Sequence, residues 1–192
     1  MSEFVVRPLD AVTWPDFARL VEKHNGVWGG CWCMEFHAEG AERSGMRRDW
    51  KQARVRDGRG HAALVYDGPE CIGWCQFGAT DELRRIKRQR AYAAAATEPS
   101  DWRITRFFVD KDYRRRGVAA AALKGALREI ARSGGGAVES YPEAIDGRSA
   151  GFLHNATLDL FQQHGFERQR PVGKHHWVVS TLVPASEERA PA

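Results

Sequence analysis

Apolar and polar positions along the chain follow two spacings, an alternation typical of strands and a recurrence every three to four residues typical of helices. Alternating or β-branched runs predict strands at residues 4–9, 61–66, 71–77, 102–109, 137–141, 166–168 and 176–180. The helical pattern predicts helices at residues 13–24 (N-cap Thr13), 44–56, 118–133 and 152–164, and a helix followed by a loop between residues 81 and 100. This order predicts an α/β (α+β) fold, in which a mixed, mostly antiparallel central sheet of six to seven strands is flanked by helices.

The chain is predicted to form one domain, because neither an internal repeat nor a long linker divides its 192 residues. We expect this domain over residues 1–183 and a flexible tail over residues 184–192. The content of 43% hydrophobic and 28% charged residues is ordinary for a globular protein and excludes a mostly disordered one. No apolar run approaches the length of a membrane span, and the N-terminus lacks the layout of a signal peptide, so a cytoplasmic protein is expected.

The net charge of +4 is small but unevenly placed. Two basic runs carry it, at residues 84–90 and 114–116. They fit either a nucleic acid or a small phosphorylated ligand, and composition does not choose between these partners. The chain has no basic stripe interleaved with aromatic residues, which weighs against a nucleic acid. The run at residues 84–90 is either a solvated helix face or a positive rim that attracts an anionic group.

The turn after the strand at residues 102–109 is the most informative segment for chemistry. It reads Asp-Lys-Asp-Tyr-Arg-Arg-Arg-Gly-Val-Ala over residues 110–119 and leads into a predicted helix. A helix N-terminus offers unpaired amides and the positive end of the helix dipole, which suits a diphosphate. The sequence contains neither Gly-x-x-x-x-Gly-Lys-Ser/Thr nor Gly-x-Gly-x-x-Gly, so the folds that these motifs mark are excluded. A basic surface turn that only caps a helix stays open as the alternative.

Two motifs together resemble a known family. Residues 114–119, Arg-Arg-Arg-Gly-Val-Ala, match Arg/Gln-x-x-Gly-x-Gly/Ala, the signature of the GNAT superfamily of acyl-coenzyme A dependent N-acetyltransferases. Further along the chain, Asn155 and the segment Phe-Gln-Gln-His-Gly-Phe at residues 161–166 look like the family's later helix. The order of elements is also similar to that of the family. The resemblance therefore covers nearly the whole chain and implies an acyl-CoA N-acyltransferase fold.

The resemblance implies that acetyl-coenzyme A is the co-substrate and inserts where two neighbouring strands separate. Its pantetheine arm would pair with the backbone of Phe107, Phe108 and Val109. Asn155 would contact the pantetheine or phosphate region from the later helix, which also carries Phe161. The diphosphate would lie on the turn formed by Arg114, Arg115, Arg116, Gly117, Val118 and Ala119.

Phe161 departs from the family pattern. Many members carry a tyrosine at this position, whose hydroxyl is thought to protonate the departing thiolate, and phenylalanine has no hydroxyl. Either another group protonates the thiolate, or the thiolate, already a fair leaving group, departs without an acid. Tyr141 is the nearest substitute acid along the sequence, and an ordinary aromatic residue at a strand end is the alternative. Glu139 is the first candidate for the base, because it is a carboxylate within an apolar strand, and an outward-facing edge residue is the alternative. His154 is a further candidate for proton transfer, or else a helix-surface histidine.

The segment at residues 28–37 is too apolar for a solvent-exposed loop. We predict that Trp28, Trp32 and Met34 line the acceptor side of the cleft, and packing in the core is the alternative. The four cysteines, at residues 31, 33, 71 and 75, are expected as thiols. One pattern has metal-ligand residue types without the spacing of structural zinc, so no metal is predicted on His24, Cys31, Cys33 and His37.

The sequence therefore predicts an N-acetyltransferase that transfers the acetyl group of acetyl-CoA to a primary amine, on a small molecule or a protein lysine. The expected mechanism is direct attack in a ternary complex, which needs a path for the amine proton and donors for the developing oxyanion. The alternative is a non-catalytic acyl-CoA-binding sensor module, which the missing hydroxyl of Phe161 favours. The expected partners are acetyl-CoA and an amine acceptor, with no nucleic acid and no membrane, and a homodimer is in keeping with the superfamily.

Overall fold

A single sheet runs through the described residues of the computed structural model, which are 4–42, 45–87, 89–94, 99–143 and 155–187. Its strands are β1 (Val5–Pro8), β2 (Ala62–Asp67), β3 (Glu70–Ala79), β4 (Trp102–Val109), β5 (Gly136–Ser140), β6 (Glu167–Val172) and β7 (His176–Val183). They are ordered β1-β2-β3-β4-β5-β7-β6. β4 and β5 run parallel, and every other pair of neighbours is antiparallel. The structure confirms the mixed, mostly antiparallel sheet expected from the sequence.

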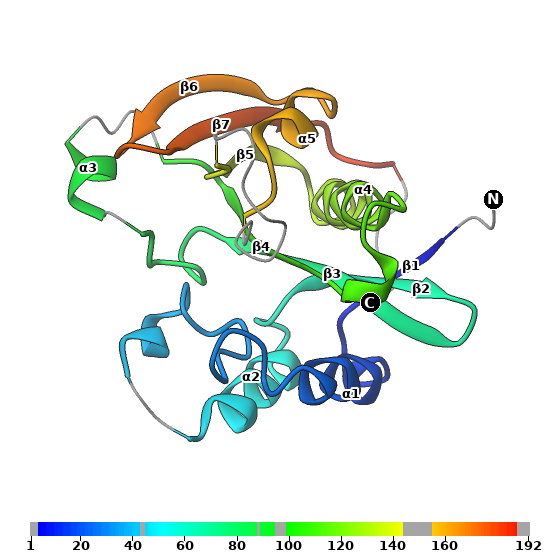
Figure 1. Cartoon of the computed structure of the whole chain (residues 1–192). Coiled ribbons are helices and arrows are strands. Elements are labelled where there is room, and N and C mark those ends of the chain that lie inside the picture. Colours follow the sequence, from blue (N-terminus) through cyan, green and yellow to red (C-terminus); the bar gives the residue numbers. More distant parts are fainter. Residues whose placement is uncertain (1–3, 43–44, 88, 95–98, 144–154, 188–192) are drawn as a thin grey trace.

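Helices cover both faces of this sheet. Within the described residues they are α1 (Trp14–Lys23), α2 (Arg47–Arg56), α3 (Gln89–Ala93), α4 (Val118–Arg132) and α5 (Leu158–Gln162), with short 3-10 turns at Ala38–Ala41 and Lys111–Tyr113. Figure 1 shows α4 and α5 on one face of the sheet and α1 and α2 on the other. α4 is the longest helix, as expected from a segment rich in alanine and leucine.

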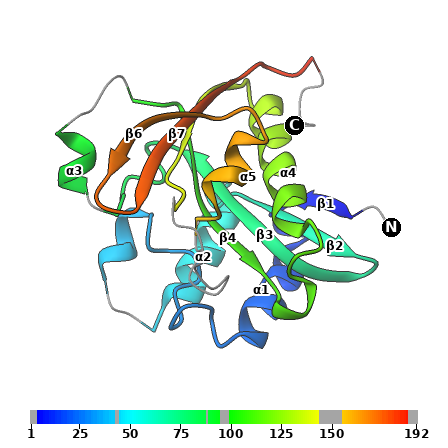
Figure 2. The same cartoon turned by 45° about the horizontal axis from the view of Figure 1, so that its top comes forward.

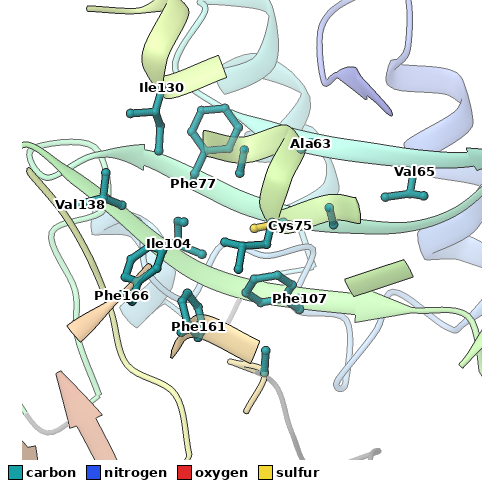
Figure 3. Packing of buried hydrophobic residues seen from close by; sticks show 14 of the residues in the cluster. Ala63, Val65, Cys75, Phe77, Ile104, Phe107, Ile130, Val138, Phe161 and Phe166 are labelled. Carbon is teal, nitrogen blue, oxygen red and sulfur yellow. The ribbon is translucent and has the colours of Figure 1, made fainter. Parts of the chain in front are cut away.

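Each face of the sheet has its own apolar core. The core under α4 and α5 joins β-strand residues such as Ile104 and Phe107 to Leu123 of α4 and Phe161 of α5. Figure 3 shows Phe161 and Phe166 against Ile104 and Phe107, and the Phe161 ring meets the Phe107 ring edge-on with centroids 5.8 Å apart. The second core lies under α1 and includes the segment at residues 27–34. The sheet is therefore buried on both sides along β3 and β4.

β4 contains one extra residue. Gln76 of β3 pairs with Arg106 and Phe77 pairs with Ile104, so Thr105 is a bulge without a partner of its own in β3. Because of this extra residue, Ile104 and Phe107 both face the α4 core, while Arg106 lies on the opposite face against Trp28 and Phe36 rings.

β4 and β5 stay paired for a short distance only. Their register covers Trp102–Ile104 against Val138–Ser140, and β5 ends at Ser140 while β4 continues to Val109. Ser140 closes the paired region, since its hydroxyl donates to Ile104 O at 2.8 Å. Within the described residues, the β5-side edge of β4 is therefore not covered by a strand after Ile104 (Figure 2).

The expected helix at residues 152–164 is shorter in the structure. Residues 144–154, which include the proton-transfer candidate His154, lie outside the described residues, and α5 begins only at Leu158. Ala156 has φ +59°, outside the helical region, and Thr157 caps α5 by accepting from Leu160 N at 3.3 Å. The expectation that Asn155 lies on the helix is therefore wrong, since it lies in the turn before the cap.

Other boundaries also differ from the expectation. Thr13 does occupy the N-cap position of α1, but its hydroxyl donates to Pro8 O at 2.8 Å and makes no cap hydrogen bond. Of the expected helix at residues 44–56, residue 44 lies outside the described part, and α2 begins at Arg47. Most of the basic run at residues 84–90 precedes the five-residue α3 and is not helical.

The start of the expected tail packs against α4. Ser186 N donates to Ala131 O at 2.8 Å, while residues 188–192 lie outside the described part of the chain. Within the residues that the structure describes, none of the helices has both the length and the apolarity needed to cross a membrane.

Candidate active site

A cavity of about 320 Å³ lies between the end of β4, the start of α4 and the start of α5. Its walls are mostly apolar, and they contain most of the residues that the resemblance assigned to the coenzyme. The lining residues are Trp28, Phe107, Phe108, Val109, Arg114, Arg115, Gly117, Val118, Ala119, Ala120, Ala156, Thr157 and Leu160. Their contact with a coenzyme stays a prediction, but the structure brings them together on one cavity.

The start of α4 forms the polar end of this cavity. Gly117 caps the helix with φ +84°, a left-handed conformation that glycine adopts without strain. The first helical amide with an acceptor inside α4 is that of Ala121, which donates to Gly117 O at 3.0 Å. The amides of Val118, Ala119 and Ala120 therefore have no acceptor within the helix, and the positive end of the helix dipole coincides with them. This wall suits an anion.

The three arginines of the turn differ in their surroundings. Arg114 and Arg115 line the cavity, so their charges add to that of the helix end. Arg116 does not line it, because its Nη2 pairs with Asp67 Oδ2 at 3.3 Å. Arg116 lies instead on a neighbouring groove along α4, which also carries Lys124.

Two buried oxygens near the point where β4 and β5 separate have no hydrogen-bond partner among the described residues. Asn155 donates through Nδ2 to Tyr141 O at 3.2 Å, but its Oδ1 is unpaired. The second is Thr105 Oγ1, at the bulge of β4. Buried polar atoms are seldom left unpaired in proteins, so both residues are candidates to hydrogen-bond a ligand, the threonine hydroxyl as donor or acceptor and the amide oxygen as acceptor, although neither residue lines the cavity.

Phe161 does not line the cavity. Its ring is fully buried in the α4-side core, edge-on to Phe107 and with its centroid 4.9 Å from that of Phe166. Its neighbours Thr157 and Leu160 form the cavity wall in its place. The expected contact between Phe161 and the coenzyme stays a prediction, and the geometry supports an indirect role through Phe107.

The apolar segment at residues 28–37 is divided between the cavity and the core. Trp28 lines the cavity, with its ring centroid 5.8 Å from that of Phe108. Trp32 and Met34 are buried in the α1-side core, where Trp32 stacks on Trp14. For these two residues the structure favours the core-packing interpretation, because neither contributes to the cavity wall.

Positive φ angles fix the shape of this segment. Val27 and Trp28 have φ +53° and +44°, a conformation that is costly for residues other than glycine and persists only where the surroundings impose it. The guanidinium of Arg106 also lies over the Trp28 ring, with Arg106 Cζ 4.8 Å from the ring centroid. The strained backbone therefore places one aromatic ring between the cavity and a buried arginine.

Glu139 is held by three donors. Its carboxylate accepts from Arg103 Nε at 2.9 Å, from the Tyr92 hydroxyl at 2.9 and 3.0 Å, and from the Tyr141 hydroxyl. Burial and the adjacent Glu139 carboxylate raise the pKa of Tyr141 well above its ordinary value. Neither Glu139 nor Tyr141 lines the cavity. The arrangement shows Glu139 positioning Tyr141 and Arg103, and the expected roles of base and acid stay predictions.

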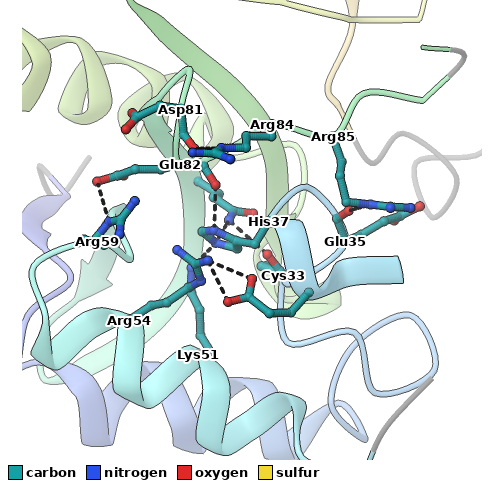
Figure 4. Close-up of polar contacts among 12 residues, drawn as sticks. Cys33, Glu35, His37, Lys51, Arg54, Arg59, Asp81, Glu82, Arg84 and Arg85 are labelled. Carbon is teal, nitrogen blue, oxygen red and sulfur yellow. Dashed lines mark hydrogen bonds and ion pairs between the residues drawn. The ribbon is translucent and has the colours of Figure 1, made fainter. Parts of the chain in front are cut away.

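A second buried polar cluster joins the segment at residues 33–37 to α2 and β3 (Figure 4). Lys51 Nζ lies 3.5 Å from His37 Nε2, and Gln76 Nε2 lies 3.0 Å from the same atom, while His37 Nδ1 is 3.2 Å from Glu82 O. Burial lowers the pKa of Lys51 to about 8. Burial, together with the positive charges of Lys51 and Arg54, lowers the pKa of His37 to about 2. His37 is therefore neutral and donates from Nδ1.

The four cysteines are free and buried, which confirms the expectation of thiols. Burial raises the pKa of Cys33 to about 11 and that of Cys71 to about 12. Deprotonated thiol is the reactive form, so burial keeps these side chains unreactive.

Sequence reasoning missed several residues of the site. Ala156, Thr157 and Leu160 line the cavity, but nothing in their types marks them, since small and apolar residues are common everywhere. Glu35, the partner of Arg106, was also missed. The one available signal was a polar Thr-Arg pair at residues 105–106 inside an otherwise apolar strand.

Comparisons with known proteins agree with this geometry. A model of the acetyltransferase (GNAT) family matches residues 19–166. The PaiA N-acetyltransferase of Thermoplasma acidophilum, solved in complex with coenzyme A, aligns with TM-score 0.55 and 12% identity over 94% of this chain and 99% of its own. An N-acetyltransferase of Staphylococcus aureus Mu50 aligns with TM-score 0.55 and 13% identity over 95% and 99% of the two chains. The ribosomal-protein-S18-alanine N-acetyltransferase of Escherichia coli aligns with TM-score 0.51 and 10% identity over 99% and 100%.

No curated protein matches the chain. The structural likenesses establish the fold, and the family model, which spans most of the chain, establishes the family. The chain therefore belongs to the acetyltransferase (GNAT) family and is an acyltransferase, in a family whose enzymes use acetyl-coenzyme A.

Proposed function

We propose that this protein transfers the acetyl group of acetyl-coenzyme A to a primary amine by direct attack in a ternary complex. The observation that carries the proposal is the cavity, which joins an anion-binding helix end to the uncovered edge of β4. The helix end would bind the diphosphate of the coenzyme, and the edge of β4 would pair with its pantetheine arm. Coenzyme binding therefore requires these two features side by side. The family match supports the same chemistry.

The helix end at Gly117 would bind the diphosphate of the coenzyme. Val118, Ala119 and Ala120, whose amides have no acceptor within the helix, line the cavity, and Arg114 and Arg115 would add charge-assisted hydrogen bonds. The unpaired Asn155 Oδ1 would accept from an amide N–H of the pantetheine arm. The residues present therefore fit acetyl-coenzyme A at both ends.

The reaction forms one bond and breaks one. The lone pair of the neutral amine attacks the thioester carbonyl, a C–N bond forms, and the C–S bond breaks to release the coenzyme A thiolate. The amine nitrogen loses one proton, and the thiolate gains one. Thr105 Oγ1, unpaired at the bulge, is suited to donate to the carbonyl oxygen as negative charge develops there.

We propose that Tyr141, positioned by Glu139, turns its single O–H from that carboxylate toward the departing thiolate and gives up the proton; the proton lost by the amine balances the one that Tyr141 loses. Asn155 donates to the backbone carbonyl of Tyr141, so the strand end that carries this tyrosine lies beside a predicted coenzyme contact. Arg103 donates to the same carboxylate and holds it in place. Tyr141→Phe should lower kcat while leaving the Kd for acetyl-CoA unchanged, and an unchanged kcat would remove Tyr141 from the mechanism.

The coenzyme site is tested by Gly117→Glu. Gly117 borders the cavity, so a glutamate side chain there would occupy the diphosphate position and repel it. Calorimetry should show no acetyl-CoA binding by the folded variant. Gly165→Glu is the matched control, because Gly165 has φ +81° and open space around it but lies outside the cavity wall. The control carries the same charge and a similar backbone strain of about 1–2 kcal/mol, and it should bind acetyl-CoA normally.

Equal affinity in wild type and folded Gly117→Glu would overturn the coenzyme assignment. Catalysis is tested separately by thiol release from acetyl-CoA with a panel of primary amines. Coenzyme binding without thiol release from any amine would favour the acyl-CoA sensor over the enzyme. The homodimer stays a prediction, to be measured by the mass of the protein in solution.

A further inference from the structure

Arg106 is a buried cation with unused hydrogen-bonding capacity. Its side chain is 2% exposed, and its guanidinium lies between the Trp28 ring at 4.8 Å and the Phe36 ring at 5.3 Å. Nη2 donates to Glu35, whereas Nε is buried without a hydrogen-bond partner among the described residues. The two rings fix the plane of the guanidinium, so the edge that carries Nε and Nη2 is held in one orientation.

Glu35, the partner of Arg106, is much more exposed, with 36% of its side chain accessible. Its backbone is fixed on the other side by Arg85, whose Nε donates to Glu35 O at 3.1 Å and whose amide donates to Phe36 O at 3.0 Å. Figure 4 shows the Glu35 and Arg85 side chains next to each other, apart from the Lys51 and His37 cluster. The carboxylate of Glu35 can therefore turn away from Arg106 toward another cation while its backbone stays in place.

Arg106 lies on the face of the sheet opposite the α4-side core and is separated from the cavity by the Trp28 ring. The α4 side of β4 is filled by the core and the cavity, to which Phe107 contributes. Arg106 precedes Phe107 but faces the opposite side, one aromatic ring away from the cavity at Trp28. The bulge residue Thr105, with its unpaired hydroxyl, lies next to it in the chain.

On the basis of the acetyl transfer proposed above, we propose that Arg106 binds a carboxylate of the acceptor and that this carboxylate displaces Glu35. The acceptor class is then a primary amine that also carries a carboxylate, as amino acids do. A planar carboxylate can engage Nε and Nη2 together, whereas Glu35 receives a hydrogen bond from Nη2 only.

Charge balance favours a carboxylate over a cationic acceptor. When one carboxylate replaces another, the buried guanidinium stays paired throughout. A cationic acceptor that drew Glu35 away would leave Arg106 buried and unpaired, and an uncompensated buried charge is strongly unfavourable. Arg85 adds a positive charge next to Glu35, which further disfavours a polycation at this place.

The first test compares matched amines by thiol release from acetyl-CoA, for example γ-aminobutyrate with butylamine and phenylalanine with phenethylamine, at equal concentrations of neutral amine. The wild type should prefer the carboxylated member by about tenfold or more in kcat/KM, the size expected for hydrogen bonds to a charged group. Arg106→Lys keeps the charge but loses the planar fork, and it should reduce this ratio to near one, mainly through KM. Arg84→Lys, the same change at an exposed arginine whose Nε donates to Asp81 O, should leave the ratio unchanged.

The second test is independent of turnover. Butyrate and 3-phenylpropanoate, which lack the amine, are titrated calorimetrically into the protein with coenzyme A present. Binding is expected in the wild type, stronger binding in Glu35→Gln, and none in folded Arg106→Lys. A wild type that prefers the carboxylate-free amines, or that binds neither acid, would overturn the inference. Thiol release from no amine together with carboxylate binding would count against the proposed transferase function alone.

Discussion

At the scale of single residues, the site depends on where buried polar atoms find partners. His37 is the clearest case, because its ring joins α2, β3 and the loop at Glu82 through three contacts. Only the neutral imidazole fits this place, since Lys51 and Gln76 both donate toward Nε2. Protonation of His37 should therefore destabilise the segment at residues 33–37, which contains Glu35 and Phe36, two contacts of Arg106.

Lowering the pH should destabilise the fold through His37. The pKa of His37 is about 2 in the folded protein and about 6.5 in the unfolded chain. Between these values the unfolded chain binds a proton that the folded protein does not, so stability rises with pH in this window and falls as pH drops below 6.5. From pH 6.5 to 4.5 the loss from this group is about 2–3 kcal/mol.

The measurement is urea unfolding at pH 6.5 and 4.5 for the wild type and His37→Gln. The variant should lose less stability than the wild type over this interval. Lys51→Met should raise the pKa of His37, because it removes a nearby positive charge, and so should move the acid end of this window to higher pH. Equal losses in wild type and His37→Gln would contradict the assignment of His37 as the titrating group.

At the scale of elements, the position of α4 determines the shape of the cavity. Two glycines permit its close approach to the sheet. A Cβ at Gly73 of β3 would lie 2.7 Å from Phe108 O and 2.9 Å from Val118 Cγ1, and a Cβ at Gly125 of α4 would lie 2.4 Å from Val6 Cγ1. The helix start at Gly117 can contact a ligand only because the helix lies this close to the strands.

Gly125→Ala should therefore destabilise the protein, although alanine favours helix by about 1 kcal/mol over glycine. The clash with Val6 outweighs that gain, because a separation of 2.4 Å forces the Val6 side chain, β1 or α4 to move, and Ala63 Cβ at 3.2 Å leaves little room on the other side. Thermal unfolding should show a lower Tm for Gly125→Ala. The double variant with Val6→Ala should recover much of the loss, since it removes the contacting methyl group. A Tm at or above the wild-type value in the single variant would show that the contact is relieved without a net cost in stability.

At the scale of the whole molecule, the net charge of +4 matters less than its position. Arg114 and Arg115 lie at the start of α4 on the cavity, whereas Arg132 at its other end pairs with Glu129 at 2.8 Å. Charges at the cavity strengthen the field that attracts a polyphosphate, and salt weakens this attraction.

Arg115→Gln should raise the Kd for acetyl-CoA by about five- to tenfold, the loss expected for one charge-assisted contact. It should also make the Kd less dependent on salt between 50 and 500 mM NaCl. Over this range screening of charges goes from weak to strong, because the Debye length is about 10 Å at 0.1 M salt and about 3 Å at 1 M. Arg132→Gln removes the same net charge and should leave both quantities unchanged. If the two variants weaken binding equally, overall charge rather than a local contact attracts the coenzyme.

Much of the fold followed from local patterns. The strand at residues 102–109 and the start of α4 at Val118 were predicted at their observed positions, because β-branched, apolar and glycine residues act within a few neighbours. The turn before α5 was not predicted, since Ala156 adopts φ +59° and Thr157 caps the helix only in the folded context. The site was predicted best where it follows a contiguous motif and least where side chains from distant segments meet.

The sequence by itself determined the order of elements, the glycine turn at the start of α4 and the resemblance to an acetyltransferase family, because each depends on residues close together in the chain. Only the tertiary structure decided which aromatic residues line the cavity, that Glu139 is held by Arg103 and two tyrosines, and that Arg106 faces Glu35. The physical reason is that the bulge at Thr105 and the long-range burial of β4 set the direction of each side chain. A local pattern contains neither of these, so the acceptor side of the site appears only once the strands and loops are assembled.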